Sequence, residues 1–188
     1  MAADEFGRLA QGIGNGRVKA TDTIRFIHKH QVPPDRFKDM TYIKFVCTIR
    51  TKKKYPFRTR ATMGGNLINY PDNVGTPTAN LLLIRIFLNS IISTPGAKFA
   101  NADISNFYLM MPLKRPEYAK IKFSDIPEEV IKEYKLDEKV TLDEWVYIEV
   151  VRGMYGLPQA ESLGHDLLES RLNTCLLYTS TLPTTSRV

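Results

Sequence analysis

One carboxylate and one aromatic side chain mark the stretch of this sequence with the clearest potential for chemistry. Asp103 ends a short run in which Phe99, Asn101 and Asp103 share one face of a strand, since side chains alternate along a strand. Tyr108 follows five residues later, and Pro112 closes the segment because it supplies no N–H to a continuing ladder. Such a pair is typical of a corner that holds a metal ion and a substrate. The alternative is a strand end with a solvated Asp103 and a packed Tyr108, because short motifs also match by accident.

Two arginines offer a second chemistry, the binding of phosphate oxygens. Alternating apolar residues predict a half-buried strand over residues 43–49, and a second strand over 57–63 places Arg58, Arg60 and Thr62 on one face. The planar guanidinium fork donates two hydrogen bonds at once, which suits phosphate. The alternative is a solvated hairpin whose charged edges prevent aggregation.

Other elements must position these groups. Residues 1–20 hold four glycines without helical or strand periodicity, which predicts a flexible lead-in. A helix over residues 81–92, begun by Thr76-Pro77-Thr78, is apolar around most of its circumference and is predicted to lie in the core. Pro95 stops this helix and delivers the chain into the Asp103 strand.

The second half mixes strands and helices. Alternation predicts strands near residues 118–123 and 145–151, and Pro127 followed by two glutamates predicts a helix start. A glycine-punctuated turn over 152–159 precedes a helix with a leucine face. Because no strict βαβ repeat is present, the pattern favours an α+β fold.

The charge of the chain is basic but regional. The 188 residues carry a net charge of +6, and residues 1–60 hold 14 Lys/Arg against 5 Asp/Glu, whereas residues 125–149 hold 3 against 9. A basic first third favours an anionic partner such as nucleic acid or a phosphorylated substrate, although a solvated surface explains the same pattern. Composition does not choose between them.

Several classes of protein are disfavoured. Cys47 and Cys175 are far apart, and no Cys/His cluster has zinc-ligand spacing. The longest apolar run, residues 81–88, is interrupted by Arg85 and is too short to span a bilayer, and the N-terminus lacks an apolar signal core. We therefore expect an intracellular, soluble protein with no membrane partner.

Two separated segments together resemble one family. Asp103-Ile-Ser-Asn-Phe-Tyr108, followed by Pro112-Leu113, resembles the first palm motif of reverse transcriptases, and Tyr155-Gly-Leu-Pro-Gln-Ala160 resembles their second. The arginine hairpin with the helix that follows it is similar to the fingers segment of copia-type LTR retrotransposon polymerases. The match covers about residues 20–173, and two motifs in register are more specific than either alone.

The resemblance implies reverse-transcriptase fingers and a partial palm over residues 21–174, built as a mixed, mostly antiparallel sheet packed on helices. The implied activity is RNA-directed DNA polymerisation, which extends a DNA primer on an RNA or DNA template from dNTPs. This nucleotidyl transfer uses two Mg²⁺ ions, with Mn²⁺ as an alternative. The parent would be a retrotransposon polyprotein with RNase H and integrase domains, in the cytoplasm or in virus-like particles.

The resemblance also implies roles for individual residues. Asp103 would be the catalytic metal ligand, and Tyr108 would lie under the incoming sugar and exclude a ribose 2′-hydroxyl. Arg58 or Arg60 would hold the triphosphate, and Gln159 would help to shape the nucleotide pocket. The basic strand faces would follow the phosphate backbone.

The sequence departs from the family at three places. The third motif, Tyr-x-Asp-Asp, is absent, and since one carboxylate cannot hold two metal ions, we expect these 188 residues alone to be inactive. Glu161 stands where relatives usually carry a small residue, and its charge would repel a triphosphate. Cys175-Leu-Leu-Tyr-Thr-Ser180 is also the translation of a transposase-end sequencing adapter, so residues 175–188 are interpreted as a non-native tail. A genuine Thr/Ser-rich tail is the alternative.

Two other functions remain open. The first is a non-catalytic, basic nucleic-acid-binding module from a decayed element, which would use the hairpin and the basic strand faces. The second is a structural or interaction domain whose motifs coincide by chance. Binding that survives Asp103→Ala without metal-dependent primer extension would favour the module.

Overall fold

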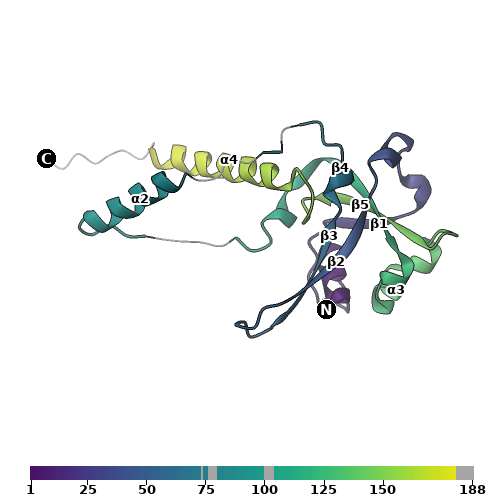
Figure 1. Ribbon diagram of the computed structural model, residues 1–188. Helices are drawn as coiled ribbons and strands as arrows, with labels where there is room; N and C mark the ends of the chain where they lie inside the picture. The colour runs from purple at the N-terminus through teal and green to yellow at the C-terminus, as the bar shows by residue number, and fades with distance from the viewer. Residues whose placement is uncertain (73, 76–79, 100–103, 181–188) are drawn as a thin grey trace.

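The computed structural model describes residues 1–72, 74–75, 80–99 and 104–180, with side chains to residue 174 (Figure 1). It contains nine helices and strands in these ranges, joined by turns and short 3-10 helices. In chain order they are α1 (Ala2–Leu9), β1 (Ile24–Ile27), β2 (Thr41–Ile49), β3 (Phe57–Met63), α2 (Leu81–Ser93), β4 (Pro112–Lys122), α3 (Glu128–Tyr134), β5 (Trp145–Arg152) and α4 (Ala160–Ser180).

The strands form one mixed sheet in the order β1-β5-β4-β2-β3. Only β2 and β4 run parallel, with Thr41 opposite Ala119, and the other neighbours are antiparallel. The α+β prediction and the mixed, mostly antiparallel sheet are therefore confirmed.

The β2–β3 hairpin has the predicted alternation but only part of the predicted burial. Ile43 pairs with Met63 and Ile49 with Phe57, so Arg58 and Arg60 share a face as expected. Ile43 is buried, whereas Ile49 is 67% exposed. The reason is that β4 pairs with β2 only at Thr41 and Tyr42, so the rest of the hairpin extends beyond the sheet (Figure 1).

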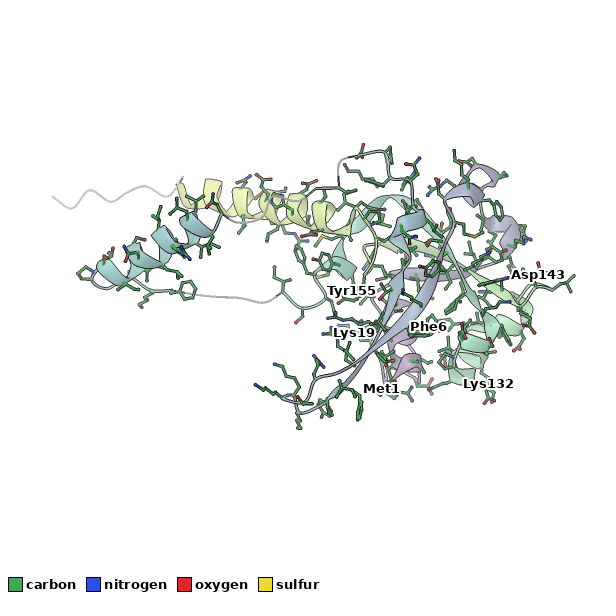
Figure 2. The ribbon with its side chains drawn as sticks, in the orientation of Figure 1. Met1, Phe6, Lys19, Lys132, Asp143 and Tyr155 are labelled. Atoms are coloured by element: carbon green, nitrogen blue, oxygen red, sulfur yellow. The ribbon has the colours of Figure 1, made fainter. Side chains whose placement is uncertain are left out.

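The main core covers one face of the sheet and includes α1. Phe6 and Leu9 are fully buried, and the Phe6 ring packs 5.8 Å from Phe26 and 5.2 Å from Phe45, between centroids (Figure 2). The prediction of a flexible lead-in over residues 1–20 was therefore wrong for its first half. The helix is only eight residues long, and its stability comes from the buried aromatic face rather than from length.

The apolar helix α2 was predicted to lie in the core, and this was also wrong. None of its residues is buried, with Leu83 at 64% and Ile92 at 83% exposure, and the helix runs away from the sheet (Figure 1). Its N-cap is Asn80, whose side chain accepts the Leu82 N–H at 2.8 Å. The predicted start at residues 76–78 lies outside the described residues.

The strand predicted to end at Asp103 cannot be compared, because residues 100–103 lie outside the described residues. From Ile104 the chain forms a turn that leads into a 3-10 helix, Tyr108–Met110. Pro112 then opens β4 rather than closing a segment, opposite Arg152. A proline is tolerated there because the first residue of a strand need not donate to the ladder.

Candidate functional site

A cavity of about 700 Å³ lies where β3 faces the segment that precedes β4. Arg58 and Arg60 enter it from β3, Tyr108 from the 3-10 helix and Tyr155 from the turn after β5. Three of the residues predicted to bind a nucleotide are thus brought together. The remaining lining residues are Ile104, Ser105, Asn106, Phe107 and Leu168.

The two arginines carry unused hydrogen-bond donors. The Arg60 guanidinium carbon lies 4.6 Å from the centroid of the Tyr155 ring, a cation–π contact worth about 0.5–2 kcal/mol. The Arg60 Nε is buried without a hydrogen-bond partner among the described residues. Neither Arg58 nor Arg60 forms a salt bridge within that part of the chain. Two half-buried guanidinium groups at a cavity, neither with an ion-pair partner among the described residues, form a favourable environment for an anion.

Glycine brings the Tyr155 turn against the end of β3. The Met63 N–H donates to the Tyr155 carbonyl at 2.8 Å, and Gly156 adopts φ +90°. A Cβ on Gly156 would lie 2.1 Å from the Met63 carbonyl oxygen, and one on Gly65 would lie 2.0 Å from the Gly156 oxygen. Because neither contact is possible for another residue, these glycines allow the close approach that places Tyr155 under Arg60.

Tyr108 forms the aromatic wall on the other side of the cavity. Its ring centroid is 6.1 Å from that of Tyr155, at an interplanar angle of 77°, and 5.6 Å from that of Phe107. The backbone just after Tyr108 is bonded to the residue that follows β5, since the Gly153 N–H donates to the Met111 carbonyl at 2.7 Å. Edge-to-face packing of this kind fixes ring orientation, so Tyr108 offers a flat, half-buried surface beside the arginines.

The metal site at Asp103 stays a prediction. Asp103 lies outside the described residues, and among those described no three His, Cys, Asp or Glu side chains converge. The described lining of the cavity contains no carboxylate. Glu161 lines a neighbouring hollow with Tyr108 and Tyr155, so a negative charge does lie beside the aromatic wall.

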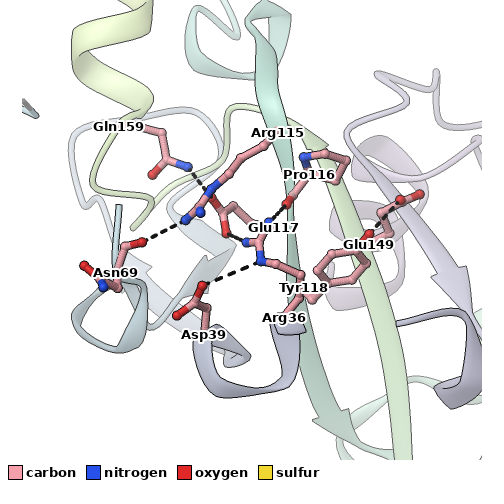
Figure 3. Close-up of polar contacts among 9 residues, drawn as sticks. All are labelled: Arg36, Asp39, Asn69, Arg115, Pro116, Glu117, Tyr118, Glu149 and Gln159. Carbon is pink, nitrogen blue, oxygen red and sulfur yellow. Dashed lines mark hydrogen bonds and ion pairs between the residues drawn. The ribbon is translucent and has the colours of Figure 1, made fainter. Parts of the chain in front are cut away.

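Gln159 does not line the cavity and is instead buried beside Glu117 (Figure 3). Its Nε2 donates to Glu117 Oε1 at 3.0 Å. Arg36 Nη2 donates to Glu117 Oε2 at 2.5 Å, and Arg115 Nε to Oε1 at 3.1 Å. A fully buried carboxylate requires such partners, and this one joins the 3-10 helix Pro34–Asp39, β4 and the turn before α4.

The Glu117 cluster was missed from the sequence, although one signal was present. Glu117 falls two and four residues before Ala119 and Ile121, so it extends the inward face of the strand predicted near residues 118–123 by one position. A charge at an inward position indicates a buried partner. Beside it, burial and the nearby Glu149 carboxylate raise the pKa of Tyr118, whose hydroxyl lies 3.4 Å from that carboxylate.

Basic and aromatic side chains also gather outside the cavity. At the hairpin tip, Tyr55 is 71% exposed and Lys54 Nζ lies 5.6 Å from its ring centroid. On β4, Lys120 and Lys122 place their Nζ atoms 4.5 and 4.6 Å from the Trp145 centroid. Such pairs are suited to a nucleic-acid backbone and its bases.

Comparisons with protein-family models, curated proteins and solved structures gave no match to this chain. The described helices include none that is long and apolar enough to cross a membrane.

Proposed function

We propose that this chain is part of an RNA-directed DNA polymerase of the copia-type retrotransposon kind, and that the cavity binds the triphosphate of an incoming dNTP. The observation that carries the proposal is the convergence of Arg58, Arg60 and Tyr108 on one cavity from segments far apart in the chain. Tyr155, from the second motif, completes the site by stacking on Arg60.

Each of the described site residues would have its own role in binding the dNTP. Arg58 and Arg60 donate to phosphate oxygens, and the Tyr155 ring holds the Arg60 fork in place. Tyr108 lies beside the sugar and blocks a ribose 2′-hydroxyl. Gln159 acts indirectly, because its bond to Glu117 fixes the start of α4 rather than contacting the nucleotide.

Asp103 would hold one of the two Mg²⁺ ions of the parent enzyme, and such ions would supply the Lewis-acid chemistry that nucleotidyl transfer to a primer requires. The RNA or DNA template, the DNA primer and the polyprotein's RNase H and integrase domains are the proposed partners. The cytoplasm or virus-like particles are the proposed location.

The direct test is equilibrium binding of a dNTP to the purified chain. Arg60→Gln removes the fork while keeping a polar side chain of similar reach, and we expect about a 10- to 100-fold loss of affinity, since hydrogen bonds to charged groups contribute about 1.5–3 kcal/mol. Arg60→Lys retains the charge without the planar guanidinium, so its dNTP affinity should lie between those of the unaltered chain and Arg60→Gln.

The matched control is Arg25→Gln on β1. Arg25 is an exposed strand arginine whose Nη1 lies 3.8 Å from Glu149, and it does not line the cavity. The Arg25→Gln variant should bind dNTP with the same affinity as the unaltered chain. Equal losses in the two variants, or no saturable binding by the unaltered chain, would contradict the proposal.

A second function, nucleic-acid binding without catalysis, is favoured by the hairpin tip. Arg50, Lys52, Lys53 and Lys54 are exposed there with Tyr55 and Phe57. Replacing the three lysines by Gln should weaken single-stranded RNA or DNA binding and flatten its salt dependence by about 2–3 in slope. If dNTP binding is absent while this salt-dependent binding persists, the second function is the better account.

A further inference from the structure

The helix α1 contacts both walls of the cavity through two charged residues. Glu5, only 6% exposed, uses Oε1 to accept the Ala61 N–H at 3.2 Å. Ala61 directly follows Arg60, and β3 is the last strand of the sheet within the described residues, so this N–H faces no further strand there. Glu5 therefore fixes the arginine-bearing wall at a point where the sheet itself does not.

Arg8 extends this contact to the opposite wall. Its Nε and Nη2 donate to Glu5 Oε2 at 3.1 and 2.6 Å. Its Nη1 remains and donates to Asn106 Oδ1 at 2.7 Å. Asn106 lines the cavity two residues before Tyr108, so one guanidinium links the loop of the aromatic wall to the carboxylate that holds β3.

The backbone around this link is firmly placed. Phe6 and Leu9, on either side of Arg8, are fully buried, and the Arg8 carbonyl accepts the Thr21 N–H at 2.7 Å and its Oγ1 at 2.8 Å. Asn106 has φ +56°, a left-handed conformation that asparagine adopts more readily than most residues. The link therefore joins an anchored helix to a loop that has few other restraints within the described residues.

We propose that Arg8 is a positioning residue that holds residues 104–108 at a fixed distance from β3, and so sets the width of the triphosphate cavity. The inference rests on the proposed function for the identity of the ligand. Arg8 does not contact the nucleotide. It acts through Asn106 on the wall that carries Tyr108, and through Glu5 on the wall that carries Arg60.

The test uses two variants that cut the link from opposite ends. Arg8→Gln removes the guanidinium, and Asn106→Gly removes the acceptor while keeping a residue that tolerates positive φ and leaving the Glu5–Arg8 pair intact. Each should lower dNTP affinity about tenfold, the scale of one lost charged hydrogen bond. The double variant should be no weaker than the weaker single variant, and Arg8→Lys should recover part of the loss.

Arg17→Gln is the control, since Arg17 pairs with Asp4 and Glu129 at 3.1 and 2.7 Å and does not line the cavity. Hydrogen exchange of residues 104–110 is the second readout. It should accelerate in Arg8→Gln and Asn106→Gly but not in Arg17→Gln.

The two readouts separate this inference from the proposed function. If the unaltered chain does not bind dNTP, the proposed function fails, and faster exchange confined to residues 104–110 still supports the positioning role. Unchanged exchange in that segment overturns the inference. Additive losses in the double variant, or an equal loss in Arg17→Gln, overturn it as well.

Discussion

α1 and α2 are two short helices with opposite relations to the rest of the protein. α1 mixes charged and apolar residues, yet Phe6 and Leu9 are fully buried and Glu5 is almost so. α2 is apolar along nearly its whole length, yet none of its residues is buried. An apolar composition indicates that a helix would be stabilised by burial, but it does not show whether the rest of the chain provides a surface that buries the helix.

The comparison also separates two kinds of contribution to the candidate site. α1 reaches Ala61 on β3 and Asn106 in the loop by hydrogen bonds. α2 supplies no lining residue to the cavity. We therefore expect changes in α1 to alter both stability and binding, and changes in α2 to alter neither strongly.

The largest expected effect is that of Phe6→Ala. It removes a fully buried ring that packs on Phe26 and Phe45, and we expect the free energy of unfolding to fall by about 3–5 kcal/mol. Leu83→Ala in α2 is the comparison and should change it by no more than about 0.5 kcal/mol. Denaturant unfolding measures both, and similar costs would break the contrast between the helices.

Glu5→Ala comes next, because it removes the acceptor of the Ala61 N–H and of the Arg8 Nε and Nη2 donors. We expect a loss of about 2–3 kcal/mol in unfolding free energy, typical of a buried polar group left unpaired. The control is Glu129→Ala on α3. The Glu129 side chain is 43% exposed in its pair with Arg17, so this change should cost less than about 1 kcal/mol. A smaller cost at Glu5 than at Glu129 would argue against its structural role.

Asn80→Ala tests whether α2 behaves as an independent element. The change removes the N-cap bond to the Leu82 N–H, which contributes about 1 kcal/mol to a helix. We expect faster hydrogen exchange within Leu81–Ser93 and an unchanged midpoint of global unfolding. A shifted global midpoint would show that α2 is coupled to the core.

The smallest effect concerns pH and α1. A hydrogen bond with the N-terminal ammonium, together with Arg17, lowers the pKa of Asp4. Because the pKa is lower in the folded chain, the carboxylate contributes stability above its ordinary pKa, and this is lost as pH falls through the lowered value. Asp4→Asn should slightly reduce the fall in the free energy of unfolding as the pH is lowered. Unfolding measured from about pH 2 to 6, the range in which carboxylates titrate, tests this. An unchanged pH dependence of the free energy of unfolding would show that Asp4 does not contribute to acid sensitivity.

Local patterns predicted the hairpin that carries the arginines. Alternation placed Arg58 and Arg60 on one face, and β3 has the bounds that the pattern indicated. Tyr108 was singled out by its offset from Asp103, and it does line the cavity with the arginines. The first prediction depended on short-range periodicity and the second on a short spacing, and a single sequence contains both kinds of pattern.

The remaining features depend on partners distant in the chain. Gln159 is buried because Glu117 accepts its amide, and Arg8 matters because Asn106 lies in reach of its guanidinium. No local sequence pattern predicts either of these long-range contacts. The lead-in prediction failed for the same reason, since the glycines after α1 concealed a helix that is stabilised by β3 and the core.

The central claim is that Arg58 and Arg60 bind a triphosphate, and NMR of the arginine Nε–Hε groups tests it most directly. Lysine variants at each position would assign the two resonances, and a dNTP with Mg²⁺ would be titrated into the labelled chain. The account predicts saturable shifts at Arg58 and Arg60 and none at Arg25. Unchanged resonances at the two cavity arginines, or equal shifts at all three, would contradict it.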